Sequence, residues 1–110
     1  MLYLHSLEVA GDPFDFIPIF NRLDKKDALY RKVCEVIDEL KNDNIVGVRI
    51  KRDQIPRYYV KKHDINAAYK VDLPGYWRLI FGIITIHDEM KALLMELFDH
   101  AQYNKRFGYK

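Results

Sequence analysis

One stretch of the chain carries hydrophobic residues at the spacing of an α-helix. Its apolar stripe recurs every three to four positions and consists of Leu29, Val33, Val36, Ile37 and Leu40. Asp24, just before the stripe, is the predicted N-cap. The Asn42-Asp43-Asn44 cluster is typical of a turn and predicts the end of this helix.

The first part of the chain predicts a strand and then a shorter helical segment. LYLHSLEV, residues 2–9, is partly alternating, which favours a β-strand. Asp12-Pro13 resembles a helix start with Pro13 at the first helical position. Phe16, Phe20 and Leu23 follow at helical spacing, but Pro18 should kink or shorten any helix there.

The period changes to two at residue 65, which predicts strands. One face of the first strand carries Ile65, Ala67, Tyr69, Val71 and Leu73, and the other carries Asn66, Lys70 and Asp72. After a turn at Pro74-Gly75, YWRLIFGIITI has apolar residues on both faces, as in a central strand. KALLMELF, after a turn at residues 87–89, predicts a third strand.

These elements predict an α+β fold in a single domain spanning residues 1–110. We expect an antiparallel β-meander of three to four strands, two N-terminal helical segments on one of its faces, and a short C-terminal helical turn. IVGVRI, residues 45–50, is either a short strand or an extended arm. Pro56 argues against a helix running straight through residues 49–63.

Composition favours a folded domain in the cytoplasm. Of the 110 residues, 49% are hydrophobic, which is enough for a packed core. No apolar run reaches membrane-spanning length, and the first residues lack the pattern of a secretory signal. Cys34 is the only cysteine, so no disulfide forms within the chain, and a reducing compartment fits.

The net charge of +2 is unevenly distributed. The segment RIKRDQIPRYYVKKH, residues 49–63, carries six Lys and Arg residues and one Asp. Such a local surplus can attract a polyanion. Charge alone leaves two interpretations open, a polyanion-binding surface and a hydrated face.

Arg78 is out of character in the predicted central strand. A charged residue in a largely buried strand must be paired or must open onto a polar cleft. A salt bridge to Asp72 or Glu96 is one interpretation. The interpretation favoured here is an anion-binding arginine on the sheet face that the helices leave open, where Gly82 gives room for a ligand to approach.

The C-terminal segment FDHAQYNKRFGYK concentrates residues that suit RNA cleavage, although a frayed, solvated terminus is the alternative. In a meander the end of the third strand lies beside the start of the second, so this segment begins near Arg78. Attack of a ribose 2′-hydroxyl on its phosphate needs a base, an acid and cations. His100 could transfer protons, and cations could neutralise the phosphate; tyrosines could stack on a base or donate a proton. The residues in these last two roles are Arg78, Lys105, Arg106, Tyr103 and Tyr109.

Other candidates are weaker. His87, Asp88 and Glu89 offer metal-ligand atoms, but neighbours in a hairpin turn rarely converge on one ion, so we expect no metal and no cofactor. Tyr58, Tyr59 and Trp77 could stack on bases, yet packing explains them as well. No partner can be named for His5.

The chain resembles the RelE/ParE superfamily, the toxin half of type II toxin–antitoxin pairs. YKVDLPGYWRLIFGI resembles that family's strand, turn and arginine-bearing strand, and ELFDHAQYNKRFGY resembles its ending. IKRDQIPRYYVKK fits the family's basic connection between helices and sheet. The resemblance covers roughly residues 20–110.

The resemblance implies a cytoplasmic toxin that cleaves mRNA, commonly in the ribosomal A site, and that a cognate antitoxin silences. It implies that Arg78, His100 and Tyr103 are the catalytic residues. The substrate-binding residues would be Arg52, Lys61, Lys62, His63, Lys105, Arg106 and Tyr109. Asp99 could orient His100 or repel phosphate. The superfamily also contains gyrase inhibitors that do not cut RNA, and a plain RNA-binding domain is a further alternative.

Overall fold

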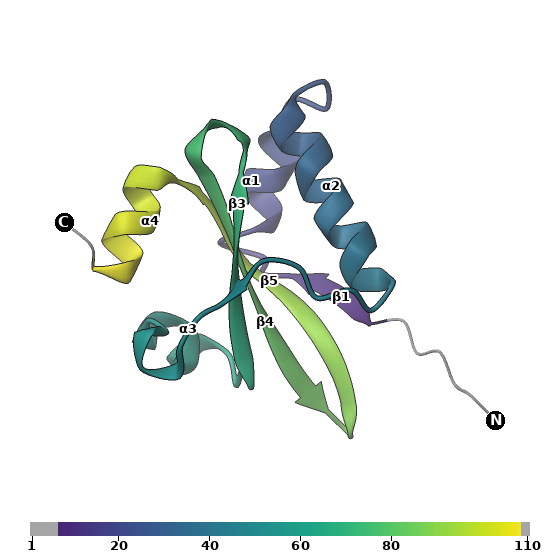
Figure 1. Ribbon diagram of the computed structural model, residues 1–110, viewed down its shortest axis with the longest axis vertical. Coiled ribbons are helices and arrows are strands. Elements are labelled where there is room, and N and C mark those ends of the chain that lie inside the picture. Colours follow the sequence, from purple (N-terminus) through teal and green to yellow (C-terminus); the bar gives the residue numbers. More distant parts are fainter. Residues whose placement is uncertain (1–6, 109–110) are drawn as a thin grey trace.

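A five-stranded mixed sheet lies at the centre of the molecule, with helices on both of its faces (Figure 1). The computed structural model describes residues 7–108. The sheet order is β1-β5-β4-β3-β2. In chain order the elements are β1 (Glu8–Gly11), α1 (Ile17–Arg22), α2 (Ala28–Lys41), β2 (Val48–Arg49), the 3₁₀ turn η1 (Arg52–Gln54), α3 (Arg57–Lys62), β3 (Ala67–Leu73), the 3₁₀ turn η2 (Pro74–Tyr76), β4 (Trp77–Ile86), β5 (Glu89–Asp99) and α4 (His100–Phe107).

The predicted meander is confirmed. β3, β4 and β5 pair antiparallel through the Pro74–Tyr76 turn and through a tight turn at His87-Asp88, both of which have positive φ. The end of β5 lies beside the start of β4, with Asp99 opposite Trp77. The predicted short strand at IVGVRI is β2, which pairs antiparallel with β3.

The α+β class is confirmed, but the sheet is not purely antiparallel. β1 adds a fifth strand, which runs parallel to β5 with Glu8 opposite Lys91. Of the predicted strand at residues 2–9, only Glu8 and Val9 belong to β1, and Leu7 precedes it. Residues 2–6, including His5, lie outside the described residues.

The apolar stripe of α2 packs as predicted. Val33, Val36 and Leu40 are buried in a cluster with Leu79, Phe81, Leu94 and other residues of the sheet, and Leu29 and Ile37 pack against it. The helix ends at Lys41, as expected from the polar cluster that follows. The predicted cap was wrong, because the N-cap is Asp27, whereas Asp24 accepts from the backbone N–H of Lys26 in the preceding turn.

The first helix starts later than predicted. α1 begins at Ile17 and accommodates Pro18 in its first turn, where the missing N–H has no intrahelical partner in any case. Residues 13–16 form a turn before it. The Asp12 carboxylate holds this turn by accepting from the N–H groups of Phe14 and Asp15, so Asp12-Pro13 is not a helix start.

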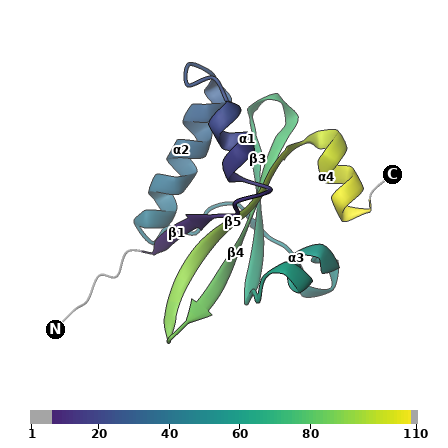
Figure 2. The ribbon, with the colours of Figure 1, turned by 180° about the vertical axis from the view of Figure 1, so that it is seen from behind.

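The second face of the sheet is not open, which corrects the expectation of helices on one face only. α1 and α2 lie on one side, and α3 and α4 lie on the other (Figures 1 and 2). A second core cluster lies beneath α3 and α4 and consists of Tyr59, Ala68, Ile80, Met95, Phe98 and Tyr103. The segment 49–63 is therefore no simple loop, because η1 and α3 form within it on either side of Pro56.

A β-bulge in β5 turns a carboxylate, that of Glu96, toward α3 and α4. Ile80 pairs with Glu96 but Phe81 pairs with Leu94, which leaves Met95 as the extra residue. The bulge lets two consecutive residues serve the same side, with Met95 in the core beneath α3 and α4 and Glu96 bonded to both helices. Glu96 thus becomes a buried carboxylate, 8% exposed.

Candidate functional site

His100 lies exposed at the first turn of α4. Asp99 is the N-cap of this helix, and its Oδ1 accepts from the backbone N–H of Gln102 at 2.9 Å. Asp99 is therefore committed to capping. The His100 ring lies with its Nε2 at 3.2 Å from Nδ2 of Asn104, one turn along, and its centroid is 6.5 Å from that of Tyr76.

Arg78 lies on the same side of the sheet as α4. Its Nε is 3.0 Å from Oδ1 of Asp72, its cross-strand neighbour, and its Nη1 donates to the Trp77 carbonyl. The guanidinium carbon lies 5.6 Å from the ring centroid of Tyr103. The salt bridge to Asp72, which was the alternative to the favoured anion-binding interpretation, is present. The buried Nε–H is not directed at that oxygen and makes no hydrogen bond among the described residues.

Lys70 is a site residue that sequence reasoning missed. Its ammonium lies 5.7 Å from the Tyr103 ring centroid and 3.7 Å from Asp72, so Lys70 and Arg78 share one carboxylate. The Asp72 side chain is 66% exposed, and a single exposed carboxylate does not neutralise two cations. These three side chains together carry one positive charge. The alternation of β3 placed Lys70 and Asp72 on one face, and that was the available signal.

Tyr76 is a second residue that was missed. It is 76% exposed, follows Gly75 in the turn before β4, and has a φ of +62°, which is uncommon for a non-glycine residue. Tyr103, by contrast, is only 7% exposed and packs against Phe98 and Phe107. Tyr76 thus offers the more accessible ring for stacking beside His100.

The room expected beside Gly82 is already filled. A Cβ at this position would lie 2.9 Å from Cγ2 of Ile65 and 3.3 Å from Cε of Met95. Gly82 therefore permits close packing of the protein's own side chains. No ligand approaches through the gap that sequence reasoning inferred there.

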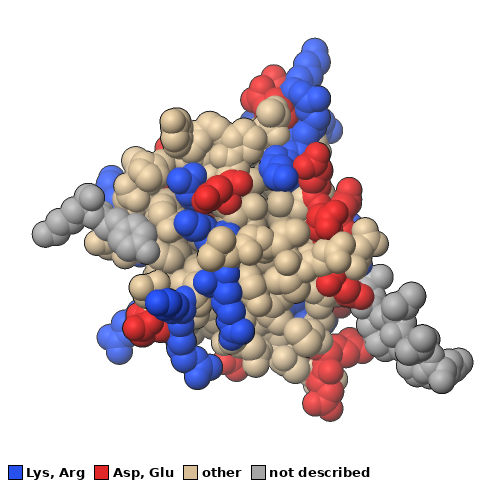
Figure 3. Space-filling model, in the orientation of Figure 1, with Lys and Arg blue, Asp and Glu red and all other residues tan. Residues whose placement is uncertain are grey.

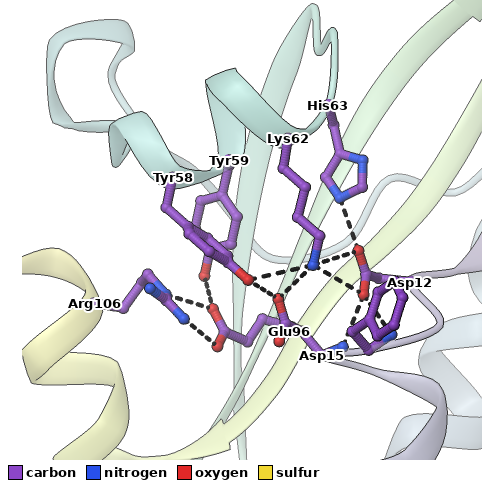
Figure 4. Close-up of polar contacts among 9 residues, drawn as sticks. Asp12, Asp15, Tyr58, Tyr59, Lys62, His63, Glu96 and Arg106 are labelled. Atoms are coloured by element: carbon purple, nitrogen blue, oxygen red, sulfur yellow. Dashed lines mark hydrogen bonds and ion pairs between the residues drawn. The ribbon is translucent and has the colours of Figure 1, made fainter.

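Glu96 joins α3 and α4 to the sheet (Figure 4). Arg106 on α4 donates to both of its carboxylate oxygens, at 2.9 and 3.1 Å, and the Tyr59 hydroxyl on α3 donates at 2.6 Å. The bidentate bond to Glu96 raises the pKa of Arg106, and burial together with the charge of Glu96 raises that of Tyr59. Arg106 and Tyr59 both stay protonated at neutral pH, so the cluster is a fixed tether.

A second polar cluster, also drawn in Figure 4, connects α3 to the turn after β1. Lys62 lies 2.8 Å from Asp15 and 3.1 Å from Asp12, and Nε2 of His63 lies 3.0 Å from Asp12. The Tyr58 hydroxyl donates to Asp15, which raises the pKa of Tyr58. Burial alone would raise the pKa of Asp12, but its backbone and lysine donors outweigh burial and lower it.

The predicted substrate-binding residues differ in whether the protein's own carboxylates already hold them. Lys62, His63 and Arg106 contact carboxylates of the protein itself. The residues Arg52, Lys61 and Lys105 are exposed. Tyr109 lies outside the described residues. The assignment of these residues to a substrate stays a prediction.

Among residues 7–108 there is no group of three His, Cys, Asp or Glu side chains placed to hold a metal ion. Within the same range, every helix is too short or too polar to cross a membrane. No protein-family model matches this chain, and neither a curated protein nor a solved structure matches it. The chemistry of the side chains therefore carries the functional argument.

Proposed function

We propose that this chain is an RNA-cleaving toxin of the RelE/ParE type, which acts on the 2′-hydroxyl and phosphate of single-stranded RNA. The observation that carries the proposal is the position of Arg78. It lies on the central strand beside Tyr103 of α4, the helix that also carries the exposed His100. The Arg78 cation thus lies against α4, and the His100 imidazole belongs to the same helix. Lys70 adds a second cation beside Tyr103.

The proposed reaction requires no external reactant. The ribose 2′-oxygen forms a bond to the adjacent phosphorus, and the bond from phosphorus to the 5′-oxygen of the next nucleotide breaks. A base takes the 2′-hydroxyl proton and an acid returns a proton to the leaving oxygen, which yields a cyclic phosphate and a 5′-hydroxyl. His100 is the proposed proton-transfer group, and Arg78 with Lys70 neutralises the phosphate.

The proposed role of Tyr103 is to position two cations, not to stack on a base. Its ring is largely buried and lies near the cationic groups of Arg78 and Lys70. Cations are attracted to the faces of aromatic rings, so the ring supports both side chains in place. Tyr76 is the proposed stacking partner for a nucleobase.

Cleavage of a labelled single-stranded RNA by the purified chain tests this proposal. We expect Arg78→Ala and His100→Ala to lower the cleavage rate by about a hundredfold, the usual size of a lost acid, base or charge-stabilising group. Arg22→Ala and His87→Ala are matched controls, because both residues lie away from α4, on α1 and on the β4–β5 turn.

Growth arrest on expression, relieved by the same two substitutions, would support the toxin role. Circular dichroism must first show that each variant is folded. Undiminished cleavage by folded Arg78→Ala and His100→Ala variants would remove the mechanism. Inhibition of gyrase supercoiling without RNA cleavage would replace the proposal with the gyrase-inhibitor alternative.

A further inference from the structure

A cleft of about 340 Å³ lies next to the β2–β3 edge of the sheet, away from His100. Its rim carries three cations, and its remaining walls come from the start of β3 and from the segment around η1. The lining residues are Arg49, Ile50, Lys51, Arg52, Ile55, Asn66 and Ala67. Of these, only Arg52 belongs to the substrate-binding set predicted from the sequence.

The cations of this cleft have no carboxylate partners within the part of the chain that the structure describes. Among residues 7–108, no ion pair or hydrogen bond engages the side chains of Arg49, Lys51 or Arg52. At the other end of the same segment, Lys62 and His63 are held by Asp12 and Asp15. Arg57 and Lys61 on α3 are also exposed and have no partner among residues 7–108. The other three unpaired cations of residues 49–63 lie together at this cleft.

The interior of the cleft fits a nucleotide better than a bare anion. Ile50, Ile55 and Ala67 supply apolar surface, against which a nucleobase can pack. Asn66 is exposed, and its side-chain Nδ2 has no partner among the described residues, although its Oδ1 accepts from the Thr85 hydroxyl. An amide at the edge of such a surface can hydrogen-bond a base.

The cleft lies on a path that leads to the proposed site of cleavage. Ile50 and Ile55 line the cleft and pack against the core cluster beneath α3 and α4, on the face of the sheet that carries Arg78 and Lys70. β3 continues from the cleft to Lys70, and the three residue steps from Ala67 to Lys70 span about 10 Å. Figure 3, which looks onto this part of the molecule, shows Lys and Arg side chains at intervals from the region of β3 and α4 down to that of α3.

We infer that this cleft binds a nucleotide of a single-stranded RNA whose scissile phosphate lies further along β3, beside Arg78 and Lys70. The inference rests on the proposed function for the choice of ligand. It adds that productive substrates extend past the reacting dinucleotide. The guanidinium and ammonium groups contact phosphates, the apolar wall contacts one base, and Asn66 reads its edge.

Binding of 2′-O-methyl RNA, which lacks the attacking hydroxyl, tests the inference separately from cleavage. Fluorescence anisotropy compares a dinucleotide with an oligomer of about ten nucleotides, a length within the range that single-strand-binding domains cover. The variant Arg49→Ala/Lys51→Ala/Arg52→Ala should bind the oligomer at least about tenfold more weakly. The slope of log affinity against log salt should fall by about 2, at roughly 0.7 per lost contact.

The dinucleotide should lose less affinity than the oligomer, because it cannot contact the cleft and the groups beside Arg78 and Lys70 at the same time. The matched control is Arg22→Ala/Lys25→Ala/Lys26→Ala, which removes the same charge from the end of α1 and the turn after it. An equal loss in this control would reduce the effect to net charge and overturn the inference. Inorganic polyphosphate that competes as well as RNA would also overturn it, because the apolar wall would then contribute nothing.

If the parent protein does not cleave RNA but the triple variant still loses affinity for the oligomer, the nucleotide-binding cleft is supported and the proposed reaction is contradicted. If the parent protein cleaves RNA but the triple variant and its control bind the oligomer equally, the proposed reaction is supported and the cleft is contradicted. Asn66→Ala adds a finer test. We expect it to weaken oligomer binding severalfold while leaving the salt slope unchanged, since it removes no charge.

Discussion

Arg106 donates two hydrogen bonds to the Glu96 carboxylate, at 2.9 and 3.1 Å, across the junction between α4 and β5. Its guanidinium also lies 3.6 Å from the ring centroid of Tyr58, on α3. One cation therefore connects the last helix to a bulged strand and to a second helix. The catalytic proposal depends on this tether, because α4 carries His100 and Tyr103.

Glu96→Ala should lower the free energy of unfolding by about 3 kcal/mol. The substitution leaves the Arg106 guanidinium and the Tyr59 hydroxyl without their acceptor, and Tyr59 is fully buried. The value lies at the low end for a broken buried pair because the Arg106 side chain is 30% exposed. Urea denaturation measures it. Glu35→Ala, which breaks an exposed pair with Lys32, is the control and should change stability by less than about 0.5 kcal/mol.

Acid should weaken the fold through Asp12. The pKa of its carboxyl lies below the ordinary 3.8 in the folded protein, so the unfolded chain binds more protons at low pH. The contribution of Asp12 is fully present at neutral pH and declines as the pH falls from about 5 through the lowered pKa. Urea titrations at several pH values should show a steeper acid loss for the parent protein than for Asp12→Asn. Equal slopes would contradict the assignment.

The sequence predicted the elements whose patterns are long and regular. α2, the meander and both of its turns follow from local spacing, because each pattern spans several residues and has a clear boundary. Within the described residues, β1 begins at Glu8 and continues to Gly11, two residues beyond the predicted end, and its parallel pairing was not foreseen. That pairing joins residues far apart in the chain, with Gly11 opposite Leu94, and no local sequence pattern encodes such a contact.

The site was predicted less completely, for a physical reason. Arg78 and His100 were identified by residue type, and the predicted meander brought the start of the central strand close to the C-terminal segment that carries His100. The partners of Lys62 and Arg106 could not be read from the sequence, because Asp12 and Glu96 lie 50 and 10 positions away. The bulge at Met95 decides which way Glu96 points, and a single extra residue leaves no periodic signal.

Adjacent lysines of α3 should behave differently. Lys62→Ala should lower the free energy of unfolding by about 2 kcal/mol, since it leaves buried Asp12 without its cation while Lys62 itself is 27% exposed. Lys61→Ala should change stability by less than about 0.5 kcal/mol, because Lys61 is exposed and has no ion-pair partner among residues 7–108. Thermal or urea denaturation of both variants checks this. Equal effects would mean that the contacts with Asp12 and Asp15 are not stabilising.

Gly47 should tolerate no side chain. Its φ is +90°, and a Cβ would lie 2.5 Å from the Lys70 carbonyl oxygen, a backbone atom that cannot move aside. Gly47→Ala should destabilise the fold by about 2 kcal/mol or more through strain and displacement of β2. Gly108→Ala is the control, because its φ is also positive but nothing lies within 4 Å of the added atom. Gly108→Ala should lower the free energy of unfolding by only about 1 kcal/mol. Equal losses of stability for the two variants in urea denaturation would exclude the steric explanation.

Substitutions at Tyr103 separate a positioning role from a chemical one. The ring centroid lies 5.6 Å from the Arg78 guanidinium carbon and 5.7 Å from the Lys70 ammonium, and the ring is largely buried. If the ring supports these cations, Tyr103→Phe retains RNA affinity and cleavage, whereas Tyr103→Leu weakens binding about five- to tenfold, the size of a partly desolvated cation–π contact. Binding to 2′-O-methyl RNA and cleavage of ordinary RNA are measured on both variants. A folded Tyr103→Phe protein that binds normally but no longer cleaves would instead assign the hydroxyl a role in proton transfer, and would make Tyr103 a catalytic residue.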